Sequence, residues 1–170
     1  MLPADHPTTA APMTLMTIGY EGLDLATFLT ALKANSVTTL VDVRELPLSR
    51  KKGFSKSALA AAVEAAGISY MHVPELGCPR DIRRDYYSDG DWSRYKKRFN
   101  AYLGGQRVTL KRLVGIAKGS RACLVCFEAD HQLCHRSLIT AALSSLDKTR
   151  IKHLRVTNPT RAEGRRAAAA

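Results

Sequence analysis

Short apolar segments alternate along this chain with segments in which apolar residues recur every three or four positions. Apolar runs of strand length lie at residues 14–19, 39–44, 68–73 and 122–127, and a weaker, alternating run lies at 151–156. Such runs are typical of strands in a parallel sheet, which is covered on both faces. Because these strands alternate with helical segments, the pattern predicts a single three-layer α/β domain with a predominantly parallel sheet of about five strands.

Helical periodicity, together with start and stop signals, defines the segments between the strands. Asp24 is a suitable N-cap for the first helix, and Gly67 is a suitable stop for the second. In contrast, residues 78–90 are polar and lack periodicity, so we expect them to be irregular. The helices are predicted at residues 24–35, 55–66, 91–103, 107–118 and 136–146.

The two ends of the chain differ in composition from the part between them. Residues 1–12 contain three prolines and no periodicity, and residues 158–170 are basic and rich in alanine. We expect both ends to be disordered and the folded domain to span residues 13–157. A domain of this size can bury a substantial core without disulfides or structural metals.

Apolar stretches long enough for a membrane span, and basic starts that lead into a signal segment, are both missing from the sequence. The sequence therefore predicts a cytoplasmic protein without a membrane partner. In that compartment the four cysteines are expected to be thiols or ligands rather than members of a disulfide framework. Nothing in the sequence identifies a cofactor or an oligomeric state.

The charge of the chain points to a class of partner. Its formal net charge is +11 and its sequence pI is about 9.8, which indicates attraction to phosphate-bearing partners, nucleic acid among them. The helix expected at 91–103 carries aromatic residues on one face and basic residues beside them. Those rings could stack on bases, but an aromatic core stripe with a solvated basic face is the favoured interpretation.

Polar side chains follow each of the four principal strands. Because the carboxyl ends of parallel strands meet at one edge of a sheet, we expect these groups to form a shared site. The groups are Tyr20 and Glu21, Asp42 and Arg44, His72 and Glu75, and the loop from Cys126 to Ser137.

The loop after the last principal strand contains several metal-ligand side chains. Thiolate, carboxylate and imidazole donors suit zinc. All of them lie in one loop, however, without a paired Cys-x-x-Cys knuckle or a second ligand cluster, and this spacing argues against a metal. We therefore predict no metal ligands, although zinc remains an alternative for Cys126, Glu128, His131, Cys134 and His135.

Nucleophilic cysteine chemistry and anion binding are the other options at this loop. Cys134 beside His135 at a helix start has the setting of a reactive thiolate, and Cys126 is the second candidate. Arg136 follows these cysteines at spacings that do not close a phosphatase-like or sulfurtransferase-like cradle.

For anion binding, Arg44, Arg50 and Arg136 could clamp a phosphate together with the helix amides near Ser137. Glu128 or Glu75 would then act as the base, and His72 or His135 as the acid. A buried structural ion pair explains Asp42 and Arg44 equally well.

Five sequence blocks resemble those of the DUF488 family. They are TIGYEG at 17–22, LVDVRELPLSR at 40–50, GFS at 53–55, YMHVPELG at 70–77 and VCFEADHQLCHRS at 125–137. The resemblance covers about residues 14–156 and implies kinship and fold class rather than an activity. The order of strand-end motifs, with Asp-Val-Arg after the second strand and a cysteine at the end of a later strand followed by Arg-Ser at a helix start, is also distantly similar to rhodanese-like domains. Their Cys-x-x-Gly-x-Arg loop is missing, however, which argues against sulfur transfer by Cys126.

Together these observations favour an intracellular enzyme that acts on a phosphate-bearing or nucleic-acid-related substrate. The alternative is a non-catalytic nucleic-acid-binding module that uses the loop at 50–56 and the helix at 91–103. Rhodanese-like cysteine chemistry and a zinc site are further alternatives.

Overall fold

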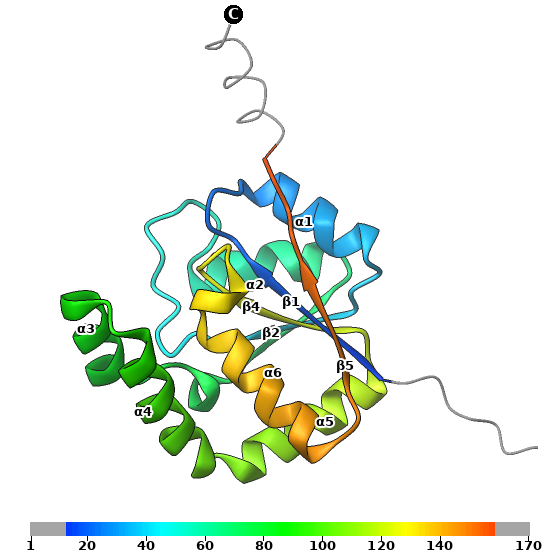
Figure 1. Cartoon of the computed structure of the whole chain (residues 1–170). Coiled ribbons are helices and arrows are strands. Elements are labelled where there is room, and N and C mark those ends of the chain that lie inside the picture. Colours follow the sequence, from blue (N-terminus) through cyan, green and yellow to red (C-terminus); the bar gives the residue numbers. More distant parts are fainter. Residues whose placement is uncertain (1–12, 159–170) are drawn as a thin grey trace, which may run out of the picture.

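A five-stranded, all-parallel sheet forms the centre of the molecule (Figure 1). The structure is a computed structural model that describes residues 13–158, so the expected disorder of residues 1–12 and of the tail from residue 159 lies outside the described residues. The strand order is β3-β2-β4-β1-β5, which confirms the predicted fold class. The strands are β1 (Thr14–Gly19), β2 (Thr39–Asp42), β3 (Ser69–His72), β4 (Ala122–Cys126) and β5 (Arg150–Leu154).

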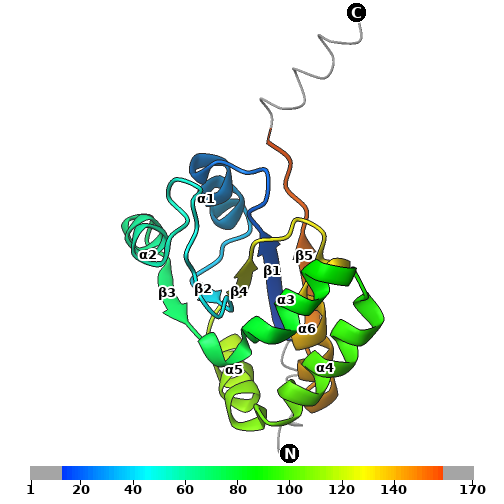
Figure 2. The same ribbon diagram turned by 90° about the vertical axis from the view of Figure 1, so that its left-hand side faces the viewer.

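Helices cover both faces of the sheet, which gives three layers (Figure 2). One face is covered by α1 (Leu25–Ala34) and α2 (Lys56–Ala65). The other is covered by α3 (Arg80–Asp89), α4 (Trp92–Gly104), α5 (Arg107–Gly119) and α6 (His135–Leu146). Two short 3-10 turns, η1 (Pro74–Leu76) and η2 (His131–Leu133), precede α3 and α6. Among residues 13–158, no helix has the length and apolarity needed to cross a membrane.

The continuous apolar runs arise because successive strand residues face opposite helix layers. In β1, Met16 and Ile18 join the core under α1 and α2, whereas Leu15 joins the core under the other four helices. Likewise Cys123 and Leu124 lie in opposite cores. A strand buried on both faces therefore needs an apolar residue at nearly every position.

The prediction of an irregular segment at 78–90 is wrong, because the structure forms α3 there. Only Ile82 of this helix is buried, so the segment has no apolar periodicity to detect. Its contacts with α4 combine ion pairs, from Arg98 to Asp81 at 2.6 Å and to Asp85 at 2.5 Å, with packing of the Tyr86 ring against Trp92 and Tyr95. The helix ends at Gly90, whose φ of 68° lies in the left-handed region.

The aromatic face of α4 belongs to the core, as favoured from the sequence. Tyr95, Phe99 and Leu103 are buried, and Trp92 stacks on Tyr95 with ring centroids 4.7 Å apart. The buried rings of Tyr95 and Phe99 are therefore unavailable for stacking on bases, whereas Trp92 is only partly buried.

The strand order places a crossover point at the centre of the sheet. From β1 the chain leads through α1 toward β2 on one side, whereas from β4 it leads through α6 to β5 on the other. β1 and β4 are neighbours, with Gly19 paired to Cys126 at their carboxyl ends. Ligands of open α/β sheets bind just outside the strand ends at such a point.

Candidate functional site

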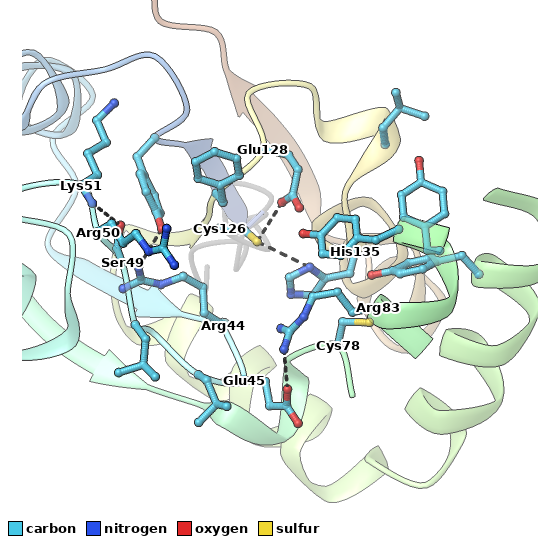
Figure 3. A pocket seen from close by; sticks show the side chains of 18 residues that line it. Arg44, Glu45, Ser49, Arg50, Lys51, Cys78, Arg83, Cys126, Glu128 and His135 are labelled. Atoms are coloured by element: carbon cyan, nitrogen blue, oxygen red, sulfur yellow. Dashed lines mark hydrogen bonds and ion pairs between the residues drawn. The ribbon is translucent and has the colours of Figure 1, made fainter. Parts of the chain in front are cut away.

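A cavity of about 520 Å³ opens at the carboxyl ends of the three central strands (Figure 3). Tyr20 follows β1, Arg44 follows β2, and Cys126 ends β4, and all three line it. The loop at 45–51 forms one wall and α3 forms another. The volume lies within the usual range of small-molecule sites.

Four side chains with reactive or ligand atoms meet at one side of this cavity; Cys126, Glu128 and His135 line it, and Cys134 contacts them without lining it. The Glu128 carboxylate oxygen Oε2 lies 3.1 Å from Cys126 Sγ and 3.2 Å from Cys134 Sγ. His135 Nδ1 lies 3.6 Å and 3.8 Å from the same two sulfurs. One ligand atom from each of the four residues lies within 4.8 Å of every other. We call Cys126, Glu128, Cys134 and His135 the donor cluster.

The loop that carries Glu128 packs tightly against the end of β1. A Cβ atom on Gly19 would lie 1.8 Å from the Glu128 carbonyl oxygen, so only glycine permits this approach. The guanidinium of Arg136 donates from one nitrogen to the carbonyls of Ile18, at 2.9 Å, and Glu128, at 2.8 Å. Arg136 is 1% exposed and fastens the loop to the sheet from behind.

His135 begins α6 and is held in one orientation. Its Nε2 lies 2.9 Å from the Val43 carbonyl oxygen, which can only accept a hydrogen bond, so Nε2 carries the proton. Its ring also contacts the edge of Phe99. Nδ1 consequently faces the two sulfurs and Glu128.

The donor cluster shifts the acidity of its members. The hydrogen bond from Cys134 and the positive charge of His135 hold the pKa of Cys126 well below its ordinary value, against the opposing effect of burial. Burial and then the charge of Cys126 raise the pKa of Glu128 to about 7. Burial alone would lower the pKa of His135, but the charge of Cys126 outweighs it and the pKa is raised.

Asp42 and Arg44 form a buried ion pair at the cavity floor. Arg44 Nε lies 2.8 Å from Asp42 Oδ1, and a terminal nitrogen lies 2.5 Å from Oδ2. The other terminal nitrogen donates to the Tyr20 hydroxyl at 3.0 Å and to the Phe54 carbonyl at 2.7 Å. Asp42 lies behind Arg44 and does not line the cavity, so the structural interpretation of this pair explains most of its contacts.

Two basic side chains of the 45–51 loop face the cavity without a carboxylate partner. Neither Arg50 nor Lys51 forms an ion pair with any residue in the described range 13–158. In Figure 3 they lie to the left of Cys126. Arg83 of α3 also lines the cavity but is paired with Glu45 at 3.2 Å.

Several residues expected at the site lie behind it or to one side. Arg136, Glu21 and Ser137 support the loop: Glu21 accepts from the Ala129 amide at 2.9 Å, and Ser137 donates to the Cys134 carbonyl at 2.9 Å. None of these three lines the cavity.

His72 and Glu75 also lie apart from the donor cluster. His72 Nε2 lies 2.9 Å from the carbonyl oxygen of Arg44. Glu75 is exposed beyond β3, and its backbone carbonyl accepts from Tyr102. Acid-base roles for these two residues therefore have no support from geometry.

The sequence interpretation missed the wall that α3 contributes. Arg83, Tyr86 and Tyr87 line the cavity from this helix, as does Cys78 just before it. The available signal was the run of arginines and tyrosines at 80–87, which is unusual for an irregular loop. Burial raises the pKa of Cys78 to about 11, which keeps that thiol protonated at neutral pH.

Comparison with known proteins gives a family but no activity. Residues 24–143 match the family described as "Domain of unknown function DUF488". No curated protein matches the chain. The matched region contains β2, β3, β4, all four donor-cluster residues and most of α6. Because it covers most of the sequence, the chain belongs to the DUF488 family.

Proposed function

We propose that this protein is an enzyme that acts on a phosphate-bearing substrate, with the donor cluster as its reacting centre. One observation carries the proposal: a single cavity has the donor cluster on one wall and the unpaired cations Arg50 and Lys51 on another. Basic side chains without a carboxylate partner are suited to hold an anionic group, and guanidinium groups bind phosphate through paired hydrogen bonds.

The remaining walls favour a substrate with a flat ring beside its phosphate. Tyr86, Tyr87 and Phe127 line the cavity, and Tyr87 is 71% exposed. The aliphatic side chain of Leu48 is 85% exposed at the same site. Exposed aromatic and aliphatic groups that gather at one cavity indicate a binding surface, and aromatic rings stack readily on nucleobases. A nucleotide, or the end of a nucleic-acid strand, has both features.

Glu128 is the proton-transfer group of the proposed reaction. It is partly buried, lines the cavity and contacts both cluster sulfurs. Cys126 lines the cavity as well. A nucleophilic Cys126 is the second candidate chemistry at the same centre, favoured by the 3.6 Å distance between its sulfur and Nδ1 of His135.

Turnover assays test this function directly. The full chain would be incubated with nucleoside monophosphates and with short single-stranded DNA and RNA, and products would be identified by mass spectrometry. We expect conversion of at least one of these compounds, and a loss of more than about 100-fold in Cys126→Ala and Glu128→Gln. Lys52→Ala should keep full activity, because Lys52 is exposed on the same loop and does not line the cavity.

Two results would overturn the proposal. One is the absence of conversion for the whole panel, and the other is conversion that persists in both cluster variants. Tight oligonucleotide binding without turnover, unchanged in Cys126→Ala, would instead support the non-catalytic nucleic-acid-binding module.

A further inference from the structure

We propose that the donor cluster is a zinc site formed by Cys126, Cys134, His135 and Glu128. The inference deepens the proposed function, on which its catalytic meaning rests, because it assigns the metal that would act at the reacting centre. Two thiolates, an imidazole and a carboxylate are the ligand types that zinc takes in proteins.

The distances within the donor cluster agree with tetrahedral coordination. For zinc bonds of about 2.0–2.3 Å, the donor atoms of a tetrahedron lie roughly 3.4–3.8 Å apart. The four distances between sulfur and the oxygen or nitrogen atoms are 3.1, 3.2, 3.6 and 3.8 Å. A zinc ion at the centre therefore needs only small outward movements of Glu128.

The surroundings of His135 match those of a metal-bound histidine. Its Nε2–H donates to the Val43 carbonyl, and its Nδ1 faces the other donors. A backbone carbonyl that binds the second ring nitrogen is the usual means by which proteins fix the tautomer of a metal ligand.

In the part of the chain that the structure describes, the uncompensated charge of buried Arg136 is an independent argument for a metal at the donor cluster. This side chain is 1% exposed and forms no ion pair within residues 13–158, and its Nε has no hydrogen-bond partner there. A buried cation needs a compensating negative charge. Zinc with two thiolates, one carboxylate and a neutral imidazole carries one net negative charge, so the loaded site would compensate the charge of Arg136.

The exposure of the four ligands indicates a catalytic rather than a structural zinc. Cys126, Cys134 and His135 are 5%, 1% and 5% exposed. Glu128 is only partly buried and lines the cavity. Three fixed ligands and one exchangeable ligand on the substrate side form an open site, at which zinc can polarise a phosphoryl oxygen or a water molecule. On binding, any protons that the donors still hold, among them that of the Cys134 thiol, pass to solvent as the zinc bonds form.

The sequence spacing had argued against a metal because all the donors lie in one loop. In the folded chain the end of β4 and the start of α6 lie at the same sheet edge, so donors from both ends of the loop can share one metal. Cys126 and Cys134 are thereby brought together from opposite ends of the loop. His131, the fifth donor of that loop, stacks on His153 instead, with ring centroids 3.7 Å apart.

Metal analysis of the full chain, expressed without a histidine tag and purified under reducing conditions without chelator, tests the proposal. We expect about one zinc per chain by mass spectrometry of the metal. Loss of a group that only hydrogen-bonds to a metal ligand lowers the affinity for zinc about 10–100-fold. Cys134→Ser removes a ligand itself and should bind zinc more than about 100-fold more weakly than wild type. Cys78→Ser is the matched control and should keep its zinc, because Cys78 lies outside the donor cluster. Glu128→Gln provides a second variant if Cys134→Ser does not fold, and its zinc should dissociate faster.

Cobalt substitution provides a readout that does not depend on activity. The wild-type chain should show a sulfur-to-cobalt charge-transfer absorption that Cys134→Ser weakens and Cys78→Ser leaves unchanged. Absence of zinc after purification, together with no uptake of zinc or cobalt by the reduced protein, would overturn the proposal. Equal zinc content in wild type and Cys134→Ser would do so as well. If zinc binds but no compound of the nucleotide panel is converted, the proposed function fails and the metal site stands.

Discussion

Arg44 turns back onto Asp42, two residues earlier in the chain, and the two side chains form a buried ion pair with two parallel hydrogen bonds. Tyr70 donates a third hydrogen bond to the same carboxylate at 2.7 Å. The pair fixes the end of β2 and directs the Arg44 guanidinium toward the cavity. The hydrogen bonds that Arg44 donates to Asp42 outweigh the effect of burial and raise the pKa of Arg44, which keeps it charged.

Asp42→Asn should therefore be strongly destabilising. Removal of one member of a buried ion pair leaves the other charge uncompensated, which costs about 3–5 kcal/mol. The free energy of unfolding, measured with urea, should fall by that amount. Lys118→Ala is the control: it breaks the exposed pair with Asp147 and should cost less than about 1 kcal/mol. Equal effects of the two substitutions would contradict a structural role for the Asp42–Arg44 pair.

Gly19→Ala tests the close packing between β1 and the donor-cluster loop. An added methyl group would overlap the Glu128 carbonyl and the Arg136 guanidinium, so the loop must move. We expect a loss of stability of about 1–3 kcal/mol, as for other overpacked sites, and loss of metal binding. Gly104→Ala should be nearly neutral because a methyl group there meets no atom within 4 Å. A Gly19→Ala protein as stable as Gly104→Ala would show that the loop packs differently.

His153 should make the stability of the fold depend on pH. Burial and the nearby charges of His131, Arg136 and Arg155 lower its pKa from 6.5 to about 4. Between these values the unfolded chain binds more protons than the folded chain, so the free energy of unfolding falls as pH falls from about 6.5 to 4. His131, whose pKa is also lowered by burial, acts in the same direction.

His153→Gln isolates this contribution. Urea unfolding at several pH values should give a shallower decline for the variant than for wild type across that window, because the carboxylates titrate in both proteins. Thr17, whose hydroxyl lies 2.7 Å from His153 Nδ1, remains available to the glutamine side chain. Parallel stability curves would mean that His153 titrates normally in the folded protein.

Arg98 should control the order of α3 and hence of one cavity wall. It bridges Asp81 and Asp85 of α3 from its position on α4. Arg98→Ala should cost only about 0.5–1 kcal/mol overall, since the pairs are partly exposed. Amide hydrogen exchange across α3 should nevertheless accelerate, because this polar helix has little apolar anchoring. Lys97→Ala, which removes an exposed charge one residue away, should leave exchange unchanged; equally fast exchange in both would argue against this role.

The sequence predicted the sheet and five of the helices because their signals are local. A strand buried on both faces, such as β4, is apolar throughout, and the helix caps are visible in the residue order. α3 escaped prediction because it has no apolar stripe: ion pairs and the single ring of Tyr86 hold it against α4. The cavity wall formed by Tyr86 and Tyr87 was missed for the same reason.

Several of the polar groups expected at the strand ends do line one cavity, but the arrangement of their side chains was not foreseen. Equivalent positions after β1, β2 and β4 meet there, as parallel topology requires. A polar residue near a strand end can either line the cavity or pack behind it. Which of the two occurs depends on contacts with residues that are distant in sequence. Arg136, for example, bonds to Ile18, a residue 118 positions away. No spacing rule distinguishes such a buried arginine from an exposed arginine that lines the cavity, such as Arg50.

We propose that the cavity binds a phosphate-bearing substrate through Arg50 and Lys51, opposite the donor cluster. Calorimetric titration of the full chain with AMP, with adenosine as the phosphate-free comparison, measures this binding. We predict saturable binding of AMP at one site, weakened about tenfold or more in Arg50→Ala, because a charge-assisted hydrogen bond contributes about 1.5–3 kcal/mol. Lys52→Ala should change the affinity less than about twofold, since exposed charges outside a site contribute little. Equal weakening by both substitutions, adenosine binding as tight as AMP binding, or no AMP binding would contradict the claim.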